Sequence, residues 1–437
     1  MIKALILAHD FPPLNSIGAR RPASWFNHFH EFGVYPVVIA KAWGNKSSNI
    51  RDILKHPVTG ETKREKTETG ELIIVPVRLS PSERLIVKHG ENSWVIIRKM
   101  LTFLSLVFAY PIFWFDKNRL IYVEARKILA TEKIDCIIAT GEPFILFKYA
   151  YKLSKEFKIP WIADYRDGWF LNHVNRQDKR FASGILRWWE FWYEKKYIRS
   201  STFITSVDPL LCEKLQKLHD KPAYVVYNGF EKFVESSENP VFQSQTLPLV
   251  LSHAGTIYPG HSLEVLLDAI HELHEEGAIT PSDINIYFLG TDFFPDQKSR
   301  LLDYKNTIRE YIFTTSRLPN QEVIKFNLKA DILLVFTEKS NPVIPAKTYE
   351  YISLQKKIVA ILNDHSILEE LITKLAAGTL IENKDALKLF LLQKIELKRK
   401  GLALTKLVPD IKAASFYLRK NQTGIFAKEI KKIITQN

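Results

Sequence analysis

The feature that most constrains this chain is an alternation between short, unbroken apolar runs and longer segments with helical periodicity. In the first half the apolar runs cover residues 3–9, 35–40, 72–77, 135–140, 160–164, 202–207 and 223–228. A run without polar alternation is typical of a parallel strand that crossover helices bury on both faces. The first half therefore predicts a doubly wound α/β sheet.

The same alternation restarts after a polar stretch at residues 231–248, with apolar runs at residues 249–255, 284–290, 311–316, 331–336 and 357–362. A chain of 437 residues is long enough for two such cores. We therefore predict two Rossmann-like domains, at residues 1–235 and 249–410, which face a cleft and are joined by a linker at 236–248. A C-terminal helical segment, 411–437, is expected to pack back on the first domain.

The charge of the chain is uneven. The net charge is +13, and residues 1–245 contribute +10 of it, with 36 Lys and Arg against 26 Asp and Glu. This excess favours an anionic partner, such as membrane lipid, nucleotide phosphate or nucleic acid, although solvated surface lysines are the alternative. Cys136 and Cys212 both lie in apolar contexts. They exclude a disulfide framework and, together with the lack of a signal-peptide pattern, favour a cytoplasmic setting.

Three charged residues follow one of the predicted strands. Asp164 ends the run at residues 160–164, and Arg166 and Asp167 follow it, so all three lie at the carboxyl end of the strand expected at Trp161 to Ala163. Ligands of doubly wound sheets bind at that edge. Because an unpaired buried carboxylate costs several kcal/mol, these charges must pair with one another, with a ligand or with water. They are candidate functional residues, and an internal Asp–Arg pair that orders the loop is the alternative.

Two further segments combine a turn with a helix start. After the first strand, Gly18 precedes a helix expected near Ala19, and the backbone N–H groups there, with Arg20 nearby, suit a phosphate; a plain helix-entry loop is the alternative. In the second half, prolines precede a helix expected near Ala346 that carries Lys347 and Glu350 on one face. This pair suits a diphosphate and a ribose, unless it is an ordinary surface ion pair.

The chain resembles the bacterial retaining glycosyltransferases of family 4, which have the GT-B fold, and especially the branch that builds surface polysaccharides. The resemblance extends from the first strand to about residue 375. It rests on six motifs in the family's order: "DFPPLNSIGARRP", "PWIADYRDGW", "VVYNGF", "HAGTIYPGHSLEVLLDAI", "ADILLVF" and "IPAKTYEYISLQKKIVAI".

The resemblance implies that the second domain binds a nucleotide sugar, with UDP- or GDP-sugars expected, and that the first binds the acceptor. Transfer is expected to proceed with retention and without a metal or a resident cofactor. The donor-binding residues implied are Gly18, Arg20, Gly255, His261, Ile344, Pro345, Lys347 and Glu350. The acceptor side would include Asn15, Glu142 and Trp169, and the residues implied in catalysis are Asp164, Arg166 and Asp167.

The sequence departs from the family pattern at three places. Many members have a glutamate eight positions before the one matched by Glu350, where this chain has Pro342. The segment "GTIYPGHS" lacks the usual Arg and Lys, which leaves Lys347, Arg20 or His261 to neutralise the diphosphate, and for His261 a helix-entry role is the favoured alternative. The segment "TGEPF" replaces a common histidine. No D-x-D motif or metal-binding spacing is present in the sequence, which agrees with metal-free transfer.

Two aromatic stretches bear on location. Residues Met100 to Phe115 are sixteen uncharged residues with basic flanks, too short for a membrane span but suited to the bilayer interface. We expect this stretch to dock on the inner leaflet, with a buried helix pair as the alternative, and a lipid-linked glycan to be the acceptor. The segment from Arg187 to Arg199 is expected to be a core helix, with a second contact surface as the alternative.

Two rival functions fit the same sequence features. Basic aromatic segments also occur in nucleic-acid-binding proteins, but no recognition motif is present and we expect no nucleic acid partner. A GT-B protein that has lost catalysis and serves as a binding or scaffolding subunit is the second rival, and Pro342 favours it. Binding of a nucleotide sugar without transfer would distinguish it from an enzyme.

Overall fold

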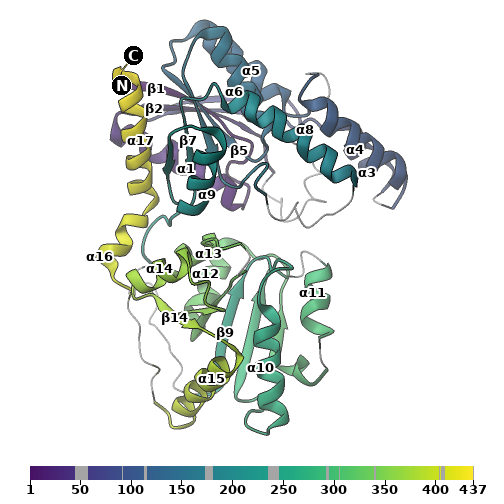
Figure 1. Cartoon of the computed structure of the whole chain (residues 1–437), viewed down its shortest axis with the longest axis vertical. Helices are drawn as coiled ribbons and strands as arrows, with labels where there is room; N and C mark the ends of the chain where they lie inside the picture. The colour runs from purple at the N-terminus through teal and green to yellow at the C-terminus, as the bar shows by residue number, and fades with distance from the viewer. Residues whose placement is uncertain are drawn as a thin grey trace. The chain divides into compact units, whose positions relative to one another are not determined.

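The computed structural model describes residues 1–44, 58–90, 92–112, 116–172, 181–234, 246–291, 295–304, 306–338, 341–402, 404 and 409–436. Residues 236–245 of the predicted linker and residues 113–115 of the aromatic stretch lie outside this part of the chain. The chain divides into two compact units, which Figure 1 shows. Unit 1 comprises Met1–Tyr227 and Arg419–Asn437, and unit 2 comprises Asn228–Leu418.

Unit 1 is built on an eight-stranded sheet with the order β3-β4-β2-β1-β5-β6-β7-β8. All neighbouring strands pair in parallel except β3 and β4. The strands are β1 (Ile2–Leu7), β2 (Val34–Lys41), β3 (Lys63–Lys66), β4 (Glu71–Val75), β5 (Cys136–Gly141), β6 (Trp161–Tyr165), β7 (Phe203–Ser206) and β8 (Ala223–Val225). The predicted apolar runs become the parallel strands, and the polar β3 is an exposed antiparallel edge strand that they did not indicate.

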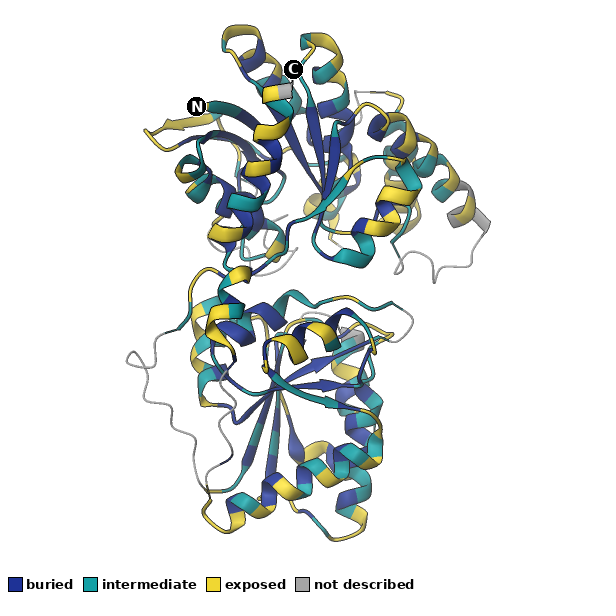
Figure 2. Cartoon of the chain, turned by 60° about the vertical axis from the view of Figure 1, so that its left-hand side comes forward, coloured by how far each residue is buried: buried dark blue, intermediate teal, exposed yellow. Residues whose placement is uncertain are grey.

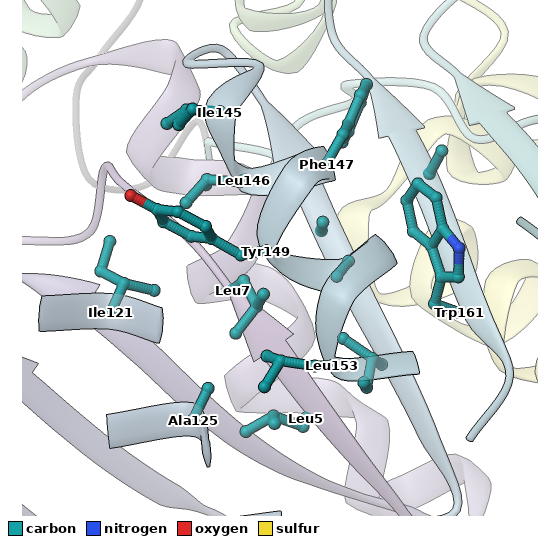
Figure 3. Close-up of a cluster of buried hydrophobic side chains, with 14 of the residues drawn as sticks. Leu5, Leu7, Ile121, Ala125, Ile145, Leu146, Phe147, Tyr149, Leu153 and Trp161 are labelled. Atoms are coloured by element: carbon teal, nitrogen blue, oxygen red, sulfur yellow. The ribbon is translucent and has the colours of Figure 1, made fainter. Parts of the chain in front are cut away.

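Helices cover both faces of this sheet. The helices of unit 1 are α1 (Ile17–His28), α3 (Pro81–His89), α4 (Val95–Ala109), α5 (Arg119–Thr131), α6 (Ile145–Phe157), α8 (Phe181–Ile198), α9 (Pro209–His219) and α17 (Arg419–Gln436). Alternate residues of β1 therefore enter different cores. Leu5 and Leu7 pack with α5 and α6, as Figure 3 shows, whereas Ala4 and Ile6 share a cluster with Phe426 of α17. Burial on both faces explains why β1 lacks polar alternation.

Unit 2 has a six-stranded parallel sheet with the order β11-β10-β9-β12-β13-β14. Its strands are β9 (Leu249–Ala254), β10 (Ile284–Leu289), β11 (Ile312–Thr314), β12 (Ile332–Phe336), β13 (Ile358–Ile361) and β14 (Gly378–Ile381). The helices are α10 (Leu263–Glu275), α11 (Pro295–Leu302), α12 (Asn320–Lys329), α13 (Ala346–Ser353), α14 (Ile367–Lys374), α15 (Lys384–Arg399) and α16 (Ile411–Ala414). The inner strands β9, β10, β12 and β13 are mostly buried, while the edge strands β11 and β14 and the outer helix faces are more exposed (Figure 2).

The predicted fold class is confirmed, because both units are α/β structures with predominantly parallel sheets. In each sheet the chain order reverses at one strand. In unit 1, β1 lies between β2 and β5, and in unit 2, β9 lies between β10 and β12. Such switch points leave a crevice outside the carboxyl ends of the strands, which is where open α/β sheets bind ligands. The polar residues at these two edges are therefore the candidate functional groups.

Candidate functional site

The carboxyl end of β6 carries Asp164, which the structure buries completely. Arg21 of α1 donates from Nη2 to Oδ1 of Asp164 over 2.6 Å, and from Nε to both carboxylate oxygens at 3.0 and 3.1 Å. The Thr205 hydroxyl donates to the same Oδ1 at 2.7 Å, and Arg21 Nη1 donates to the Val226 carbonyl at 2.6 Å. With 0% of Asp164 and 2% of Arg21 exposed, the pair ties α1 to three strand ends.

Asp164 therefore has its charge matched inside the unit, by Arg21 and not by the neighbouring Arg166. Its side chain lies in the core under the strand edge, so the structure supports the internal-pair alternative for this residue, with a different arginine. Arg21 lies on the first helix, whose inner face contacts the sheet. A sequence pattern does not show which of Arg20 and Arg21 points inward.

Arg166 instead points to the ends of β1 and β5. Its Nε donates to the Gly141 carbonyl at 2.8 Å, its Nη2 donates to the Glu142 carbonyl, and its Nη1 lies 3.5 Å from Oδ2 of Asp10. The guanidinium thus joins three adjacent strand ends and remains partly exposed. Arg166 therefore holds the ends of these three strands together.

The position of the Arg166 guanidinium leaves no room for a side chain at Gly18. A Cβ atom on Gly18 would overlap Nη1 of Arg166 and lie 2.7 Å from Oδ2 of Asp10. Ser16 caps α1 by accepting a hydrogen bond from the Ala19 N–H at 3.0 Å, and its hydroxyl lies 3.4 Å from Oδ2 of Asp10. The glycine thus allows the helix start to approach the Arg166–Asp10 pair. Asn15 and Arg20 flank this turn and are partly exposed.

Asp10 is a candidate residue that the sequence motifs did not single out. Its Oδ1 accepts a hydrogen bond from Nδ1 of His9 at 2.7 Å, and its Oδ2 faces Arg166. Burial would raise the pKa of Asp10, but the His9 hydrogen bond and the Arg166 charge outweigh it and lower the pKa. Asp10 is thus an ionised, oriented carboxylate at the switch point of unit 1.

The remaining predicted residues of this edge differ in accessibility. Glu142 and Asp167 are exposed at the ends of β5 and β6. Trp169 is 5% exposed and stacks on Phe144 with ring centroids 5.0 Å apart, inside an aromatic cluster. Glu142 and Asp167 are therefore accessible to a ligand in unit 1, whereas Trp169 is buried in the aromatic cluster and is not.

In unit 2 the decisive contact joins His253 of β9 to Lys347 of α13. Lys347 Nζ lies 2.8 Å from Nε2 of His253, and Nδ1 of His253 lies 3.0 Å from the Leu334 carbonyl oxygen. A carbonyl only accepts, so Nδ1 carries the proton and Nε2 accepts from the lysine. The ring is fully buried and desolvation lowers its pKa well below the usual value, so it is neutral.

This contact holds the ammonium group directly above the backbone at the end of β9. Gly255 has φ of +95° there, and a Cβ on it would lie 3.8 Å from Lys347 Nζ. Desolvation lowers the pKa of Lys347 to about 7, against a smaller opposing effect of Glu350. Anion binding at this site is therefore favourable, because an anion stabilises the charged form of Lys347 and raises its pKa.

Helix α13 begins at Ala346 and carries Lys347 and Glu350 one turn apart. Its Tyr351 hydroxyl accepts a hydrogen bond from the Ala254 N–H at 2.9 Å, which fixes the helix against the end of β9. Ile344 and Pro345 precede its first turn and are partly exposed, as are Lys347 and Glu350. The predicted donor residues of this segment thus lie at the switch point of unit 2.

His261 lies in the loop between β9 and α10. Its Nδ1 accepts from the Tyr258 N–H at 3.2 Å, which leaves the proton on Nε2, and desolvation together with Lys347 and Arg300 lowers its pKa to about 4. Arg300 of α11 donates to the carbonyls of Tyr258 and His261, each at 2.8 Å. The loop is thus held in place, with His261 as a neutral N–H donor near Lys347.

Among the residues that the structure describes, no group of three His, Cys, Asp or Glu side chains is placed to hold a metal ion. In the same part of the chain, no helix combines the length and apolar character needed to cross a membrane.

Solved structures with the same architecture decide the fold. Sucrose-phosphate synthase from Thermosynechococcus elongatus matches all of this chain over its own full length, with a TM-score of 0.62 and 10% identity. HepE from Anabaena in complex with UDP and glucose matches 99% of this chain and all of its own, at 0.59 and 11%. The chain has the GT-B fold. A glycosyltransferase from Rickettsia africae matches all of this chain and 99% of its own, at 0.58 and 12%.

No protein-family model matches the sequence, and no curated protein sequence matches it either. At identities near 10% the structural neighbours establish the fold alone. The GT-B architecture gives each unit a Rossmann-like sheet, in agreement with the two switch points.

The buried pair yields a stability prediction. Asp164→Ala leaves the Arg21 guanidinium uncompensated in the core and should cost about 3–5 kcal/mol of unfolding free energy. The exposed Asp167→Ala, three residues away, should change it by less than about 0.5 kcal/mol. Urea denaturation of both variants measures the difference. A normally stable Asp164→Ala protein would contradict the structural role assigned to the pair.

Proposed function

We propose that this protein is a glycosyltransferase that moves a sugar from a nucleotide-sugar donor to a glycan acceptor. The observation that carries the proposal is the cation at the switch point of unit 2, where His253 holds Lys347 above Gly255. A lysine at this position can bind the diphosphate of a nucleotide-sugar donor. The GT-B fold has a second Rossmann-like sheet, and we propose that the donor binds at this sheet, in unit 2. One neighbour, HepE, was solved with UDP-glucose, and a UDP- or GDP-sugar is the donor class we propose here.

In unit 2 each candidate residue has a definite task in this proposal. Lys347 and the N–H of His261 balance the charge of the donor diphosphate, and the backbone at Ile344 and Pro345 approaches it at the start of α13. Glu350 accepts the hydroxyls of the nucleotide ribose. His253 does not touch the donor but positions Lys347, and it was not identified by the sequence motifs.

In unit 1 the strand-edge carboxylates are proposed to receive the acceptor. Asp10 is ionised and fixed by His9 and Arg166, so it can orient a sugar hydroxyl or take its proton. Glu142 and Asp167, both exposed, bind further hydroxyls. Asn15, in the turn before α1, is proposed to contact the acceptor, whereas Gly18 and Arg20, at the start of α1, are proposed to contact the donor.

The finer assignment follows the sequence resemblance. We propose membership of the retaining family 4, transfer without a metal, and a lipid-linked acceptor in surface polysaccharide synthesis. Fixed cations and N–H groups at Lys347, His261 and the start of α13 would balance the leaving diphosphate. The second candidate function is a non-catalytic binding or scaffolding subunit, because Pro342 stands where the family pattern has a glutamate. Donor binding without turnover would establish this second function.

The titration of Lys347 gives a pH prediction. A bound diphosphate raises the pKa of this lysine above its free value of about 7, so binding takes up a proton between the two pKa values. Affinity for the nucleoside diphosphate should therefore be full below pH 7 and fall by up to about tenfold per pH unit above it. Isothermal titration calorimetry from pH 7 to 9 measures this.

The matched control is Lys347→Arg, whose guanidinium does not deprotonate in this range. Its affinity should be flat with pH, even if the absolute value differs. In His253→Ala the lysine loses the acceptor that orients it, so affinity should fall at every pH. A wild-type affinity that is constant between pH 7 and 9 would contradict the proposed role of Lys347.

The acceptor edge gives a second test of the function. Asp10→Asn should lower the turnover number about 100-fold or more, because the amide cannot take a proton, while the nucleotide affinity stays normal. Glu213→Gln, an exposed carboxylate on α9 of the same unit, is the control and should behave as wild type. Release of nucleoside diphosphate from a donor in the presence of acceptor is the readout. Equal turnover in both variants would remove Asp10 from the proposed chemistry.

A further inference from the structure

Helix α4 of unit 1 has no buried residue, although it is strongly apolar. Large apolar side chains that are exposed gather on and beside it, with Ile96 at 84% and Met100 at 54%: Trp94, Val95, Ile96, Ile97, Met100, Phe103, Leu104, Leu106 and Ile112. A single exposed leucine needs no explanation, but a contiguous set on one helix marks an interaction surface. For residues 100–112, the part of this stretch that the structure describes, the alternative of a buried helix pair does not agree with these exposures.

The side of α4 that faces the protein is fixed by one hydrogen bond. The Thr102 hydroxyl donates to Ser82 of α3 at 3.1 Å, so the Thr102 side of the helix packs on α3. Ile96, Met100 and Phe103 are spaced by four and three residues and share a stripe on a different side. This stripe faces away from α3, and all three side chains are exposed.

Helix α8 lies beside the end of α4 and extends the surface. Trp189 Nε1 donates to the Val107 carbonyl at 3.2 Å, and Tyr193 and Tyr197 are buried on the inner side of α8. On its outer side Trp188 is 65% and Trp192 49% exposed. The segment predicted as a core helix is thus buried on one side only. Figure 1 shows α3, α4 and α8 together in one part of unit 1.

The charges around this surface are mostly positive. Exposed basic residues lie on all three helices: Arg84, Lys88, Lys99, Lys195 and Lys196. No acidic residue occurs in α4, and Glu83 of α3 is paired with Lys117 at 2.6 Å. Lys196 also lies 4.9 Å from the ring centroid of Trp192. The surface therefore combines an apolar stripe, exposed tryptophans and cations.

We propose that the α4–α8 surface, formed by the exposed residues of α4 with Trp188 and Trp192, docks on an anionic lipid bilayer. Helix α4 lies in the plane of the interface, with Ile96, Met100 and Phe103 among the acyl chains. The tryptophans sit at the headgroup level and the lysines contact lipid phosphates. Charge complementarity favours this partner over a second copy, whose identical surface would bring the same cations together.

Vesicle binding tests the proposal directly. The full-length protein should co-sediment with vesicles of equal parts phosphatidylglycerol and phosphatidylethanolamine, and only weakly with phosphatidylcholine alone. Binding should decrease at high salt, because exposed cation–lipid contacts are screened. The double variant Ile96→Ser/Phe103→Ser should reduce the vesicle partition coefficient by at least about tenfold.

The matched control is Leu389→Ser, which removes an apolar side chain that is 70% exposed on α15 of unit 2. It should bind vesicles as wild type does. Nucleotide affinity should be unchanged in both variants, so failure of the docking proposal is separable from failure of the proposed function. No vesicle binding by wild type, or equal binding by the double variant, overturns the proposal. So does a wild-type dimer that the same double substitution dissociates, since a second copy would then be the occupant.

Discussion

Both candidate sites depend on one constraint, which is that parallel strands bring all their carboxyl ends to the same edge of a sheet. At the reversal of strand order in unit 1 this places Asp10, Gly141 and Arg166 together, although up to 156 residues separate them in sequence. At the reversal in unit 2 it brings His253 of β9 within reach of Lys347, 94 residues later. Helices that bury the sheet faces leave this edge as the place for polar groups.

The charged groups at the two sheet edges are stabilised in different ways. In unit 1 Asp164 and Arg21 neutralise each other in the core. Arg166 donates hydrogen bonds to two carbonyls and lies beside Asp10. In unit 2 desolvation lowers the pKa of Lys347 to about 7, and the neutral His253 is its hydrogen-bond acceptor. An incoming anion is stabilised at such a site, because it favours the charged form of the lysine more strongly than Glu350 does. In the proposed function, the first edge receives the acceptor and the second binds the donor.

Much of the fold follows from the sequence, because strands buried on both faces leave unbroken apolar runs such as that of β1. The edge strand β3 was missed, since Lys63 to Lys66 is polar and its pairing depends on β4. Lys347 and Glu350 were identified from local spacing at a helix start. The partners of Asp164 and Lys347 were not, because Arg21 and His253 are distant in sequence and their directions depend on tertiary packing. An apolar stretch likewise does not reveal whether it is covered, as α4 shows.

Calorimetric binding of UDP, GDP, ADP and CMP to wild type, Lys347→Met and Glu350→Ala would test the donor site at α13. One nucleotide, UDP or GDP, should bind wild type selectively. Lys347→Met should weaken it by loss of the diphosphate contact, and Glu350→Ala by loss of the ribose contact. Thermal denaturation checks that each variant is folded. Binding of none of the four by folded wild type, or undiminished binding by both variants, would contradict a donor site at α13.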